Sequence, residues 1–401
     1  MIYSKTENKI FGFERNIFYT GLTSFFTDTS TKMLYSVMPL FLLSIGASKT
    51  TIALIEGIAE STASLVKVIS GSWSDKIRRN KPFMVIGYGV TAVVTPLYAF
   101  VRVPFQVLVL RFTERIGKGL RAAPRDSLIS TSVTKLDAGK NFGFHKAMDN
   151  SGAILGPLIA FILLSSFQIS YQNIFLLATI PAVIGVLTIV LFIKEPKNPE
   201  KPKEQVKFRL KSLPTRYYLF LAIIFVFTLG NSADAFLLIK TTETGIPQAY
   251  IPFVYMIFNV VSVLCAIPVG KLSDRVGRGK LITLGFVIYA VVYFLFGRYN
   301  SIHIFLFLFI LYGLYSALVD VSQKAMISDI VARDLKGTAY GIYHAVLGIT
   351  LLPASLIAGQ LYDKVNSNAP FYFGATMALC AAVLMGIFTL VTRKRCPTKS
   401  R

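Results

Sequence analysis

The sequence predicts an all-α membrane protein with twelve transmembrane helices in two pseudo-symmetric six-helix halves. Three observations lead to this fold class. First, 54% of the 401 residues are hydrophobic and only 15% are charged, whereas soluble domains carry about 25% charged residues. Second, apolar runs recur that match the roughly 20 residues a helix needs to cross a bilayer. Third, one polar loop motif occurs twice, beginning at Gly71 and at Gly270.

Each apolar run is expected to form one transmembrane helix. The first six runs cover residues 17–45, 51–70, 82–100, 104–122, 143–167 and 173–193. A Lys-, Pro- and Glu-rich stretch, residues 194–216, then interrupts the pattern and is interpreted as a cytoplasmic linker. Six further runs cover residues 217–239, 250–269, 281–296, 303–325, 339–361 and 371–392. The expected domains are therefore 1–193, the linker 194–216, and 217–401, which ends in a basic tail.

The distribution of basic residues predicts the orientation. The formal charge is +22, from 42 Lys and Arg against 20 Asp and Glu. The cations gather after the second, fourth and eighth runs, in the linker and in the tail, so the positive-inside rule places both termini in the cytoplasm. Long apolar runs argue against nucleic-acid binding, and anionic lipid at the cytoplasmic face is the expected partner of this charge. We expect a monomer in the cytoplasmic (inner) membrane, with no removable signal peptide.

Residues for catalysis or metal binding are not expected. His145, His303 and His344 lack metal-ligand spacing. The sequence has no phosphate-binding G-x-x-x-x-G-K-[ST] loop, which argues against ATP-driven transport. The three cysteines show neither metal-ligand spacing nor a disulfide framework and are interpreted as packing residues. The sequence therefore predicts no enzyme, no cofactor and no metal site.

Two motifs repeat between the halves. GSWSDKIRRNK at 71–81 and GKLSDRVGRGK at 270–280 share the pattern G-x-x-S-D-[KR]-[IV]-x-R-x-K, each after the second run of its half. RAAPRDSLI at 121–129 and KAMISDIVA at 324–332 follow the fourth run of each half. An acid–lysine pair four residues apart also recurs, as Glu114–Lys118 and Asp320–Lys324. A repeat whose unit is half the chain is a sign of duplicated architecture.

On these motifs the sequence resembles the major facilitator superfamily, over essentially its whole length. The loop signature G-x-L-A-D-R-x-G-R-K is matched closely by the second copy, whereas the first copy has Trp73 and Arg78 at two signature positions. RIGKGLRAA at 115–123 is similar to R-x-x-Q-G-x-G-A-A, with Lys118 and Arg121 as departures. The run R-x-G-K-G-x-R-x-x-P-R-D-x-L-I looks like a bacterial subgroup. The resemblance implies transport without enzymatic activity.

The loop motifs predict a conformational gate. Small residues at Gly71 and Gly270 allow helices to approach closely. Asp75 and Asp274 are expected to pair with nearby cations and a helix N-terminus, and to release them during the cycle; a topology anchor is the alternative. GAILGP at 152–157 looks like the antiporter signature G-x-x-x-G-P, which implies a leak-preventing kink; close packing alone is the alternative. The remaining gating residues are Arg79, Arg275, Arg278, Gly152, Gly156 and Pro157.

Charged residues inside the apolar runs predict a polar cavity. Each charge at mid-bilayer costs about 2.5–3.5 kcal/mol on insertion scales, so the charges must face water or one another. Asp28 is the main candidate for proton coupling, with Lys32 one turn away, and Glu56 and Glu60 form a second candidate pair. LGNSADAF at 229–236 is expected to unwind. The full candidate set is Asp28, Lys32, Glu56, Glu60, Arg111, Glu114, Arg115, Lys118, Asp149, Asn231, Asp234, Tyr312, Tyr315, Asp320, Lys324 and His344. Packing pairs and core tyrosines are the structural alternatives.

The leading hypothesis is a secondary transporter that moves a small solute by alternating access, in exchange for protons, with export slightly favoured. An uptake permease for an anionic metabolite or a siderophore is the alternative within the same fold, because Lys32, Arg111, Arg115 and Lys118 suit an anion. A non-transporting membrane sensor or a membrane enzyme is the remote alternative.

Overall fold

Helices make up most of the chain in a computed structural model that describes residues 9–77, 79–131, 138–195, 213–332 and 335–394. A short antiparallel hairpin, β1 (Lys9–Ile10) and β2 (Phe13–Glu14), comes first. The α-helices of the first half are α1 (Arg15–Ser44), α2 (Lys49–Ile77), α3 (Lys81–Leu97), α4 (Pro104–Thr131), α5 (Ala138–Ser165) and α6 (Tyr171–Phe192). Those of the second half are α7 (Thr215–Gly230), α8 (Ala235–Thr242), α9 (Ile251–Val276), α10 (Arg278–Arg298), α11 (Ile302–Ile330), α12 (Lys336–Lys364) and α13 (Ala369–Lys394). The 3-10 turns η1 (Tyr98–Phe100) and η3 (Gln248–Tyr250) complete the set.

The helices are long enough to cross a membrane. Among the described residues, nine spans satisfy both the length and the apolar character that crossing needs, and α6 is the most apolar, with a mean hydropathy of 2.7. Helices α1, α2 and α4 reach 30, 29 and 28 residues, and each carries two or more of the predicted charges. With α7 and α8 counted as two pieces of one span, the described part of the chain holds twelve long helices, which confirms the predicted fold class.

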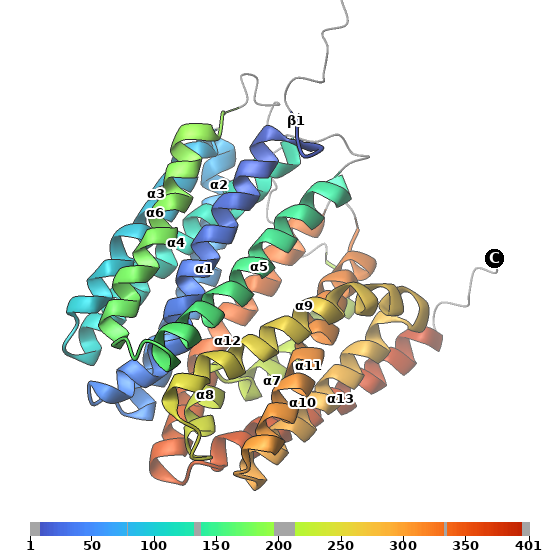
Figure 1. The fold of residues 1–401 in the computed structure, drawn as a ribbon. Helices are drawn as coiled ribbons and strands as arrows, with labels where there is room; N and C mark the ends of the chain where they lie inside the picture. The colour runs from blue at the N-terminus through green and yellow to red at the C-terminus, as the bar shows by residue number, and fades with distance from the viewer. Residues whose placement is uncertain (1–8, 78, 132–137, 196–212, 333–334, 395–401) are drawn as a thin grey trace, which may run out of the picture. The chain divides into compact units, whose positions relative to one another are not determined.

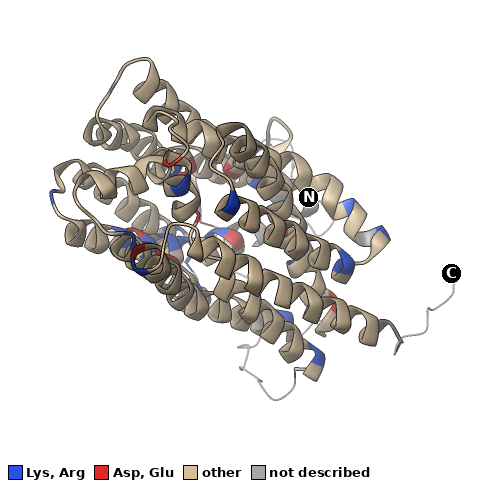
Figure 2. Cartoon of the chain, turned by 90° about the horizontal axis from the view of Figure 1, so that it is seen from below, with Lys and Arg blue, Asp and Glu red and all other residues tan. Residues whose placement is uncertain are grey.

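Apolar side chains cover the outside of the helices. On α6 the exposed positions include Leu176, Ile180, Leu187 and Leu191, and on α13 Leu379, Val383, Ile387 and Leu390 repeat the pattern. Spacings of three, four and seven residues place each set on one face of its helix. Along most of the ribbon in Figure 2 the residues are neither acidic nor basic. Such extended apolar surface is the surface of a multi-pass membrane protein.

The chain divides into two compact units. Unit 1 comprises Met1–Gly46 and Thr62–Glu204, and unit 2 comprises Ala47–Ser61 and Gln205–Arg401. The units therefore follow the two halves of the sequence except in one stretch, because the first part of α2 packs with unit 2. Ser61 shows this packing directly, since its hydroxyl donates to the carbonyl oxygen of Gly348 at 2.5 Å.

Corresponding helices make corresponding contacts within each unit. In unit 1, α1 packs on α5 and α6, and α3 packs on α4 and α6; α1 and α5 run side by side in Figure 1. In unit 2, α7 packs on α12 and α13, and α10 packs on α11 and α13. Each unit has an apolar core cluster, one around Met84, Leu128 and Ile189 and another around Val269, Leu281 and Leu318. The repeat seen in the loop motifs thus extends to helix packing.

A single glycine separates α9 from α10. Gly277 has φ +100°, a backbone conformation that side chains other than glycine rarely adopt. It is the second glycine of the loop motif GKLSDRVGRGK, so the motif encodes the turn between two long helices. The matching position of the first copy, Arg78, lies outside the described residues.

Candidate functional site

The first candidate site starts on one face of α4. Arg111, Glu114, Arg115 and Lys118 are three or four positions apart and therefore share this face. Arg111 and Glu114 are buried and ion-paired, with 3.2 Å between Arg111 Nη1 and Glu114 Oε2. The hydroxyl of Tyr98 donates to the same carboxylate at 3.1 Å. Arg115 is also buried, whereas Lys118 is exposed. Three of the four predicted charges on α4 are thus buried within unit 1, where Arg111 and Glu114 form an ion pair.

Two cations meet on one aromatic ring next to this face. Lys32 of α1 and Arg111 of α4 each place their charged group 5.4 Å from the centroid of the Tyr35 ring. Both distances are within the range of cation–π attraction. Tyr35 was not among the predicted site residues, although its position three residues after Lys32 puts it on the same side of α1.

Asp28 lies where α1 and α5 approach most closely. Gly152 of α5 packs on this turn of α1 so tightly that a Cβ there would lie 3.1 Å from the Asp28 Cβ. Asp149, one turn earlier on α5, is within electrostatic range of Asp28. The cations Arg121, Lys118 and Lys32 are also within electrostatic range of Asp28. The structure therefore brings together Asp28 and Asp149, two of the predicted site residues.

Asp149 has cationic neighbours that the sequence analysis did not name as its partners. Arg125 Nη1 lies 3.8 Å from Asp149 Oδ1, and Lys146 Nζ lies 3.9 Å from Oδ2. Arg125 also pairs with the adjacent Asp126 at 3.1 Å. Arg125 and Lys146 are thus ion-pair partners of Asp149. Arg125 was overlooked because it lies beyond the apolar run, in a helix that extends to Thr131.

A buried polar chain continues from this region toward α3. Ser24 hydrogen-bonds both the His145 imidazole, at 2.9 Å, and the Tyr88 hydroxyl, at 3.3 Å. The guanidinium of Arg121 lies 4.2 Å from the Tyr88 ring centroid and donates to Thr91 at 3.0 Å. Four helices of unit 1 thus contribute to one polar interior.

The second candidate site is the break between α7 and α8 in unit 2. The helix ends at Gly230 and resumes at Ala235, so the predicted unwinding of LGNSADAF occurs. The Tyr312 hydroxyl donates to Asp234 at 2.8 Å. The Tyr289 hydroxyl contacts the carbonyl oxygen of Gly230 at 3.0 Å and the side-chain oxygen of Asn231 at 3.3 Å. The Tyr289 hydroxyl of α10 therefore supplies a donor to a backbone carbonyl at the helix break, while Tyr312 of α11 bonds a side chain there.

Four tyrosine rings surround this break. Tyr289 and Tyr293 of α10 stack with centroids 4.0 Å apart, and Tyr315 of α11 meets Tyr289 edge-on at 4.8 Å. Tyr312 lies 5.2 Å from Tyr315. We call Tyr289, Tyr293, Tyr312 and Tyr315 the tyrosine cluster. Tyr289 and Tyr293, a one-turn repeat on α10, were not among the predicted site residues.

The other predicted cavity residues of unit 2 come from α11, α12 and the beginning of α2, and Asp320 of α11 is within electrostatic range of Tyr315. Asp320 and Lys324 are exposed positions of α11, and Ser316 donates to Asp320 at 3.4 Å. His344 packs against Tyr343, whose hydroxyl donates to Gln323 at 2.5 Å. Glu56 and Glu60 belong to the stretch of α2 that packs with unit 2, and Glu56 is buried.

The predicted gating residues are described only in part. The side chains of Asp75 and Asp274 lie outside the described residues, and so do the surroundings of Gly71. Arg79 and Arg275 are exposed. Arg278, by contrast, is ion-paired with Asp329 near the end of α11. Gly156 packs on α1, where a Cβ would lie 2.5 Å from the Thr29 carbonyl oxygen, and Pro157 follows it within α5.

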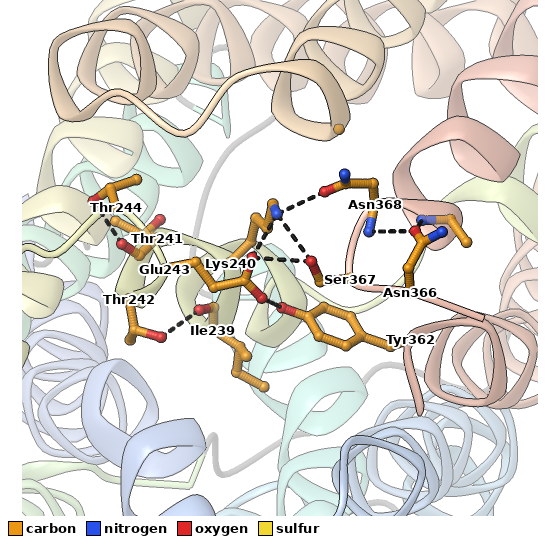
Figure 3. Close-up of polar contacts among 12 residues, drawn as sticks. Ile239, Lys240, Thr241, Thr242, Glu243, Thr244, Tyr362, Asn366, Ser367 and Asn368 are labelled. Carbon is orange, nitrogen blue, oxygen red and sulfur yellow. Dashed lines mark hydrogen bonds and ion pairs between the residues drawn. The ribbon is translucent and has the colours of Figure 1, made fainter. Parts of the chain in front are cut away.

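A further polar network, at the end of α8, has no counterpart in the sequence analysis. Figure 3 shows Lys240, Glu243, Tyr362, Ser367 and Asn368 pointing toward one another; we call these five residues the Glu243 network. Lys240 is fully buried and lies 2.6 Å from Glu243 and 2.7 Å from the Asn368 side-chain oxygen. The Tyr362 hydroxyl donates to Glu243 at 2.5 Å. Burial alone would raise the pKa of Glu243, but the hydrogen bonds from Lys240 and Tyr362 outweigh it and lower the pKa.

The residue after Tyr362 binds the start of α2. Asp363 accepts hydrogen bonds from the backbone N–H groups of Lys49, at 3.3 Å, and Thr50, at 2.7 Å. A carboxylate at a helix N-terminus satisfies donors that have no partner within the helix and interacts favourably with the helix dipole. The end of α12 therefore holds α8 through Tyr362 and α2 through Asp363.

Groups of three or more side chains suited to metal binding do not occur among the described residues. The polar groups described at the two candidate sites form ion pairs, hydrogen bonds and cation–π contacts.

Comparison with known proteins identifies relatives over nearly the whole chain. The family model described as Major Facilitator Superfamily matches residues 20–241 and 219–400. An uncharacterized MFS-type transporter of Methanocaldococcus jannaschii is 35% identical over 379 residues, which cover 92% of this chain and 94% of the relative. The multi-drug resistance efflux pump PmrA of Streptococcus pneumoniae is 24% identical, covering 90% and 91%. The multidrug resistance protein MdtG of Enterobacter lignolyticus is 23% identical, covering 93% and 92%.

Solved structures share the fold. The peptide-transporter-family protein PepTSo superposes with a TM-score of 0.81 at 13% identity, covering 95% of this chain and 99% of that chain. The nucleoside transporter NupG superposes with a TM-score of 0.76 at 14% identity, covering 95% and 100%.

Proposed function

The chain belongs to the Major Facilitator Superfamily and is a multi-pass membrane transporter, and we propose that it exchanges a small solute for protons by alternating access. In this proposal the solute binds near mid-membrane and the two units alternate in exposing it to either side. The protein lies in the cytoplasmic membrane with both termini in the cytoplasm, as the basic loops favour.

One observation carries the proposal: the approach of Asp28 and Asp149 within membrane-crossing helices. Two neighbouring carboxylates in a buried site repel each other when both are charged. The pair therefore has its lowest free energy when the two carboxylates share one proton. Arg125 and Lys146 lie near Asp149, and Lys32, Lys118 and Arg121 lie near Asp28. A positively charged solute bound beside the two acids, or a movement of these basic side chains toward them, would then favour release of the proton. Solute binding would thereby be linked to proton movement.

Export is the direction we favour. Gly152, Gly156 and Pro157 keep α5 tightly packed on α1 beside the proposed proton site. Such packing suits a helix pair that must prevent proton leak while the solute exchanges. The names of the relatives from Streptococcus pneumoniae and Enterobacter lignolyticus, an efflux pump and a multidrug resistance protein, support this direction.

An uptake permease for an anionic metabolite or a siderophore is the second candidate. It is favoured by Lys32 and Arg111, which converge on Tyr35 at equal distances of 5.4 Å. Two cations on one ring form a site that an anionic group of a solute would neutralise.

The test uses inverted membrane vesicles that contain the full-length protein and have an acidic lumen. A panel of cationic, neutral and anionic metabolites and drugs is added, and luminal pH and solute uptake are recorded. Solute accumulation with alkalinisation of the lumen supports proton-coupled export. Movement of an anionic solute out of the lumen, alone or together with protons, would favour the uptake permease. Vesicles with Asp28→Asn protein are the matched control.

A further inference from the structure

We propose that His145 carries the coupling proton between the Asp28–Asp149 pair and the cytoplasmic side of unit 1. The inference rests on the proposed proton exchange and adds the route that the proton takes. All the contacts that support it lie within unit 1.

His145 lies one helical turn from the acid pair. On α5 it precedes Asp149 by four residues, and on α1 its partner Ser24 precedes Asp28 by four residues. The two helices therefore approach each other in two successive side-chain pairs, one through His145 and one between the acids. Four residues of an α-helix advance by about 6 Å, a separation that one water molecule can bridge. In the proposed orientation α1 and α5 both begin at the cytoplasmic side, so His145 lies between the acids and the cytoplasm.

A chain of hydroxyl groups holds the His145 ring. Ser24 hydrogen-bonds Nε2 of the ring at 2.9 Å, and the Tyr88 hydroxyl hydrogen-bonds Ser24 at 3.3 Å. His145 is only 4% exposed. Because hydroxyl groups both donate and accept, this chain can reverse its direction when the ring changes tautomer or gains a proton. Imidazole can take a proton on one ring nitrogen and release one from the other, which suits it to passing protons along.

The charges near the His145 ring oppose one another. Asp149 and Asp126 attract a proton to the ring, whereas the nearby cations repel it. These cations are Arg125 and Lys146. Burial acts in the same direction as the cations, because a buried charge is poorly solvated. The ring can therefore accept a proton without trapping it, as a carrier must.

The transfer moves one proton in two steps. The proton shared by the acid pair leaves a carboxylate oxygen, and a ring nitrogen of His145 takes it up. The imidazolium then gives one proton to water on the cytoplasmic side and returns to the neutral ring. The two carboxylates are left charged, and Arg125 and Lys146 stabilise the charge of Asp149.

Net transport and exchange are compared in inverted vesicles that contain the full-length protein. The probes are ethidium, tetraphenylphosphonium and every other member of the panel that wild type accumulates. His145→Gln can still hydrogen-bond Ser24, but it cannot carry a proton. We expect it to slow gradient-driven accumulation and luminal alkalinisation about tenfold or more. Exchange of labelled probe, at equal pH and equal concentration on both sides, needs no net proton movement and should keep its wild-type rate.

Two further variants separate proton transfer from packing. His303→Gln changes an exposed histidine near the start of α11 and should transport as wild type. Ser24→Ala keeps the ring and removes its hydroxyl partner, so it should slow net transport less than His145→Gln does. It also serves where His145→Gln does not fold. The net rate of wild type should change with the pH of the medium, and this dependence should be altered in His145→Gln.

Nitrogen NMR of the purified full-length protein, labelled at histidine, measures the ring without any solute. The His145 signal is assigned by its loss in His145→Gln, and the ring should gain and lose a proton within the pH range in which the protein is folded. A ring of constant protonation overturns the proposal, and so does wild-type net transport by His145→Gln. Equal loss of net transport and exchange would show a structural role instead. Wild-type vesicles that accumulate no probe, or that accumulate one without a pH change, would contradict the proposed function.

Discussion

Arg278, at the first position of α10, is ion-paired with Asp329 near the end of α11. The two residues come from the two repeated motifs, because Arg278 belongs to the loop after α9 and Asp329 to the stretch that starts at Lys324. The structure therefore joins in one contact two sequence features that recur in each half. The gating hypothesis can therefore be tested on this ion pair in unit 2.

Removing this ion pair should alter transport more than stability. Asp329 is half-exposed, and exposed ion pairs contribute about 0.2–1 kcal/mol. We expect Asp329→Asn to leave the unfolding temperature within a few degrees of wild type while it changes the transport rate. The charge swap Arg278→Asp with Asp329→Arg should restore the rate. A swapped protein no faster than the single variants would show that the pair does not act as a gate.

The loop aspartates should govern the rate of conformational exchange. Asp75→Asn combined with Asp274→Asn should slow transport while substrate affinity stays unchanged, because the residues lie in the loop motifs and outside both candidate sites. Transport kinetics and equilibrium binding are compared on the same preparation. An unchanged transport rate in the double variant would remove the gate hypothesis for these two residues.

Asp28 should be essential for accumulation against a gradient. Asp28→Asn removes the carboxylate that lies beside Asp149, so we expect gradient-driven accumulation to be lost and some downhill exchange to remain. Glu60→Gln should have a weaker effect, because Glu60 belongs to a different compact unit. Vesicle uptake with and without a pH gradient measures both.

Exchanging the charges of Asp28 and Lys32 distinguishes a role of Asp28 in proton coupling from a simple ion pair between the two residues. If Asp28 serves only to neutralise Lys32, then Asp28→Lys with Lys32→Asp should retain full gradient-driven activity. We expect this protein to be inactive in accumulation, because Asp28 also packs against Gly152 and faces Asp149.

Gly156 of α5 should be intolerant of a methyl group. A Cβ at Gly156 would lie 2.5 Å from the Thr29 carbonyl oxygen and 2.8 Å from the Met33 nitrogen, which are backbone atoms and cannot move aside alone. We expect Gly156→Ala to destabilise the protein by about 1–3 kcal/mol and to reduce coupling. Gly143→Ala, on the same helix with open space around it, is the matched control. Equal thermal stability of the two variants would contradict the close packing.

The Glu243 network should stabilise the protein in a pH-dependent way. Because the folded-state pKa of Glu243 is lowered from 4.5, the stabilisation is present above about pH 4.5 and is lost as the pH falls through the lower folded value. Unfolding temperatures of wild type and Glu243→Gln should therefore differ at neutral pH and converge below pH 4.5. Glu14→Gln should show no such convergence. A constant difference across the range would mean that charge at Glu243 contributes nothing.

The sequence predicted the helices well because each transmembrane span is a long apolar run with polar residues beyond it. It also predicted the break after Gly230, where Gly, Asn and Asp occur together. The sequence did not predict Arg125, because α4 continues past the apolar run that defined its expected end. Residues of the Glu243 network come from α8, α12 and the connection to α13, so only the tertiary structure brings them together.

Helix α2 is continuous from Lys49 to Ile77, yet its beginning packs with unit 2 and its remainder with unit 1. One helix is thus divided between the two compact units. Cutting the chain in the linker after Glu195 would therefore leave a fragment whose second helix still carries a docking segment for the other fragment, including the Asp363 contact. The two halves of the sequence, produced as separate polypeptides, should consequently find each other in the membrane.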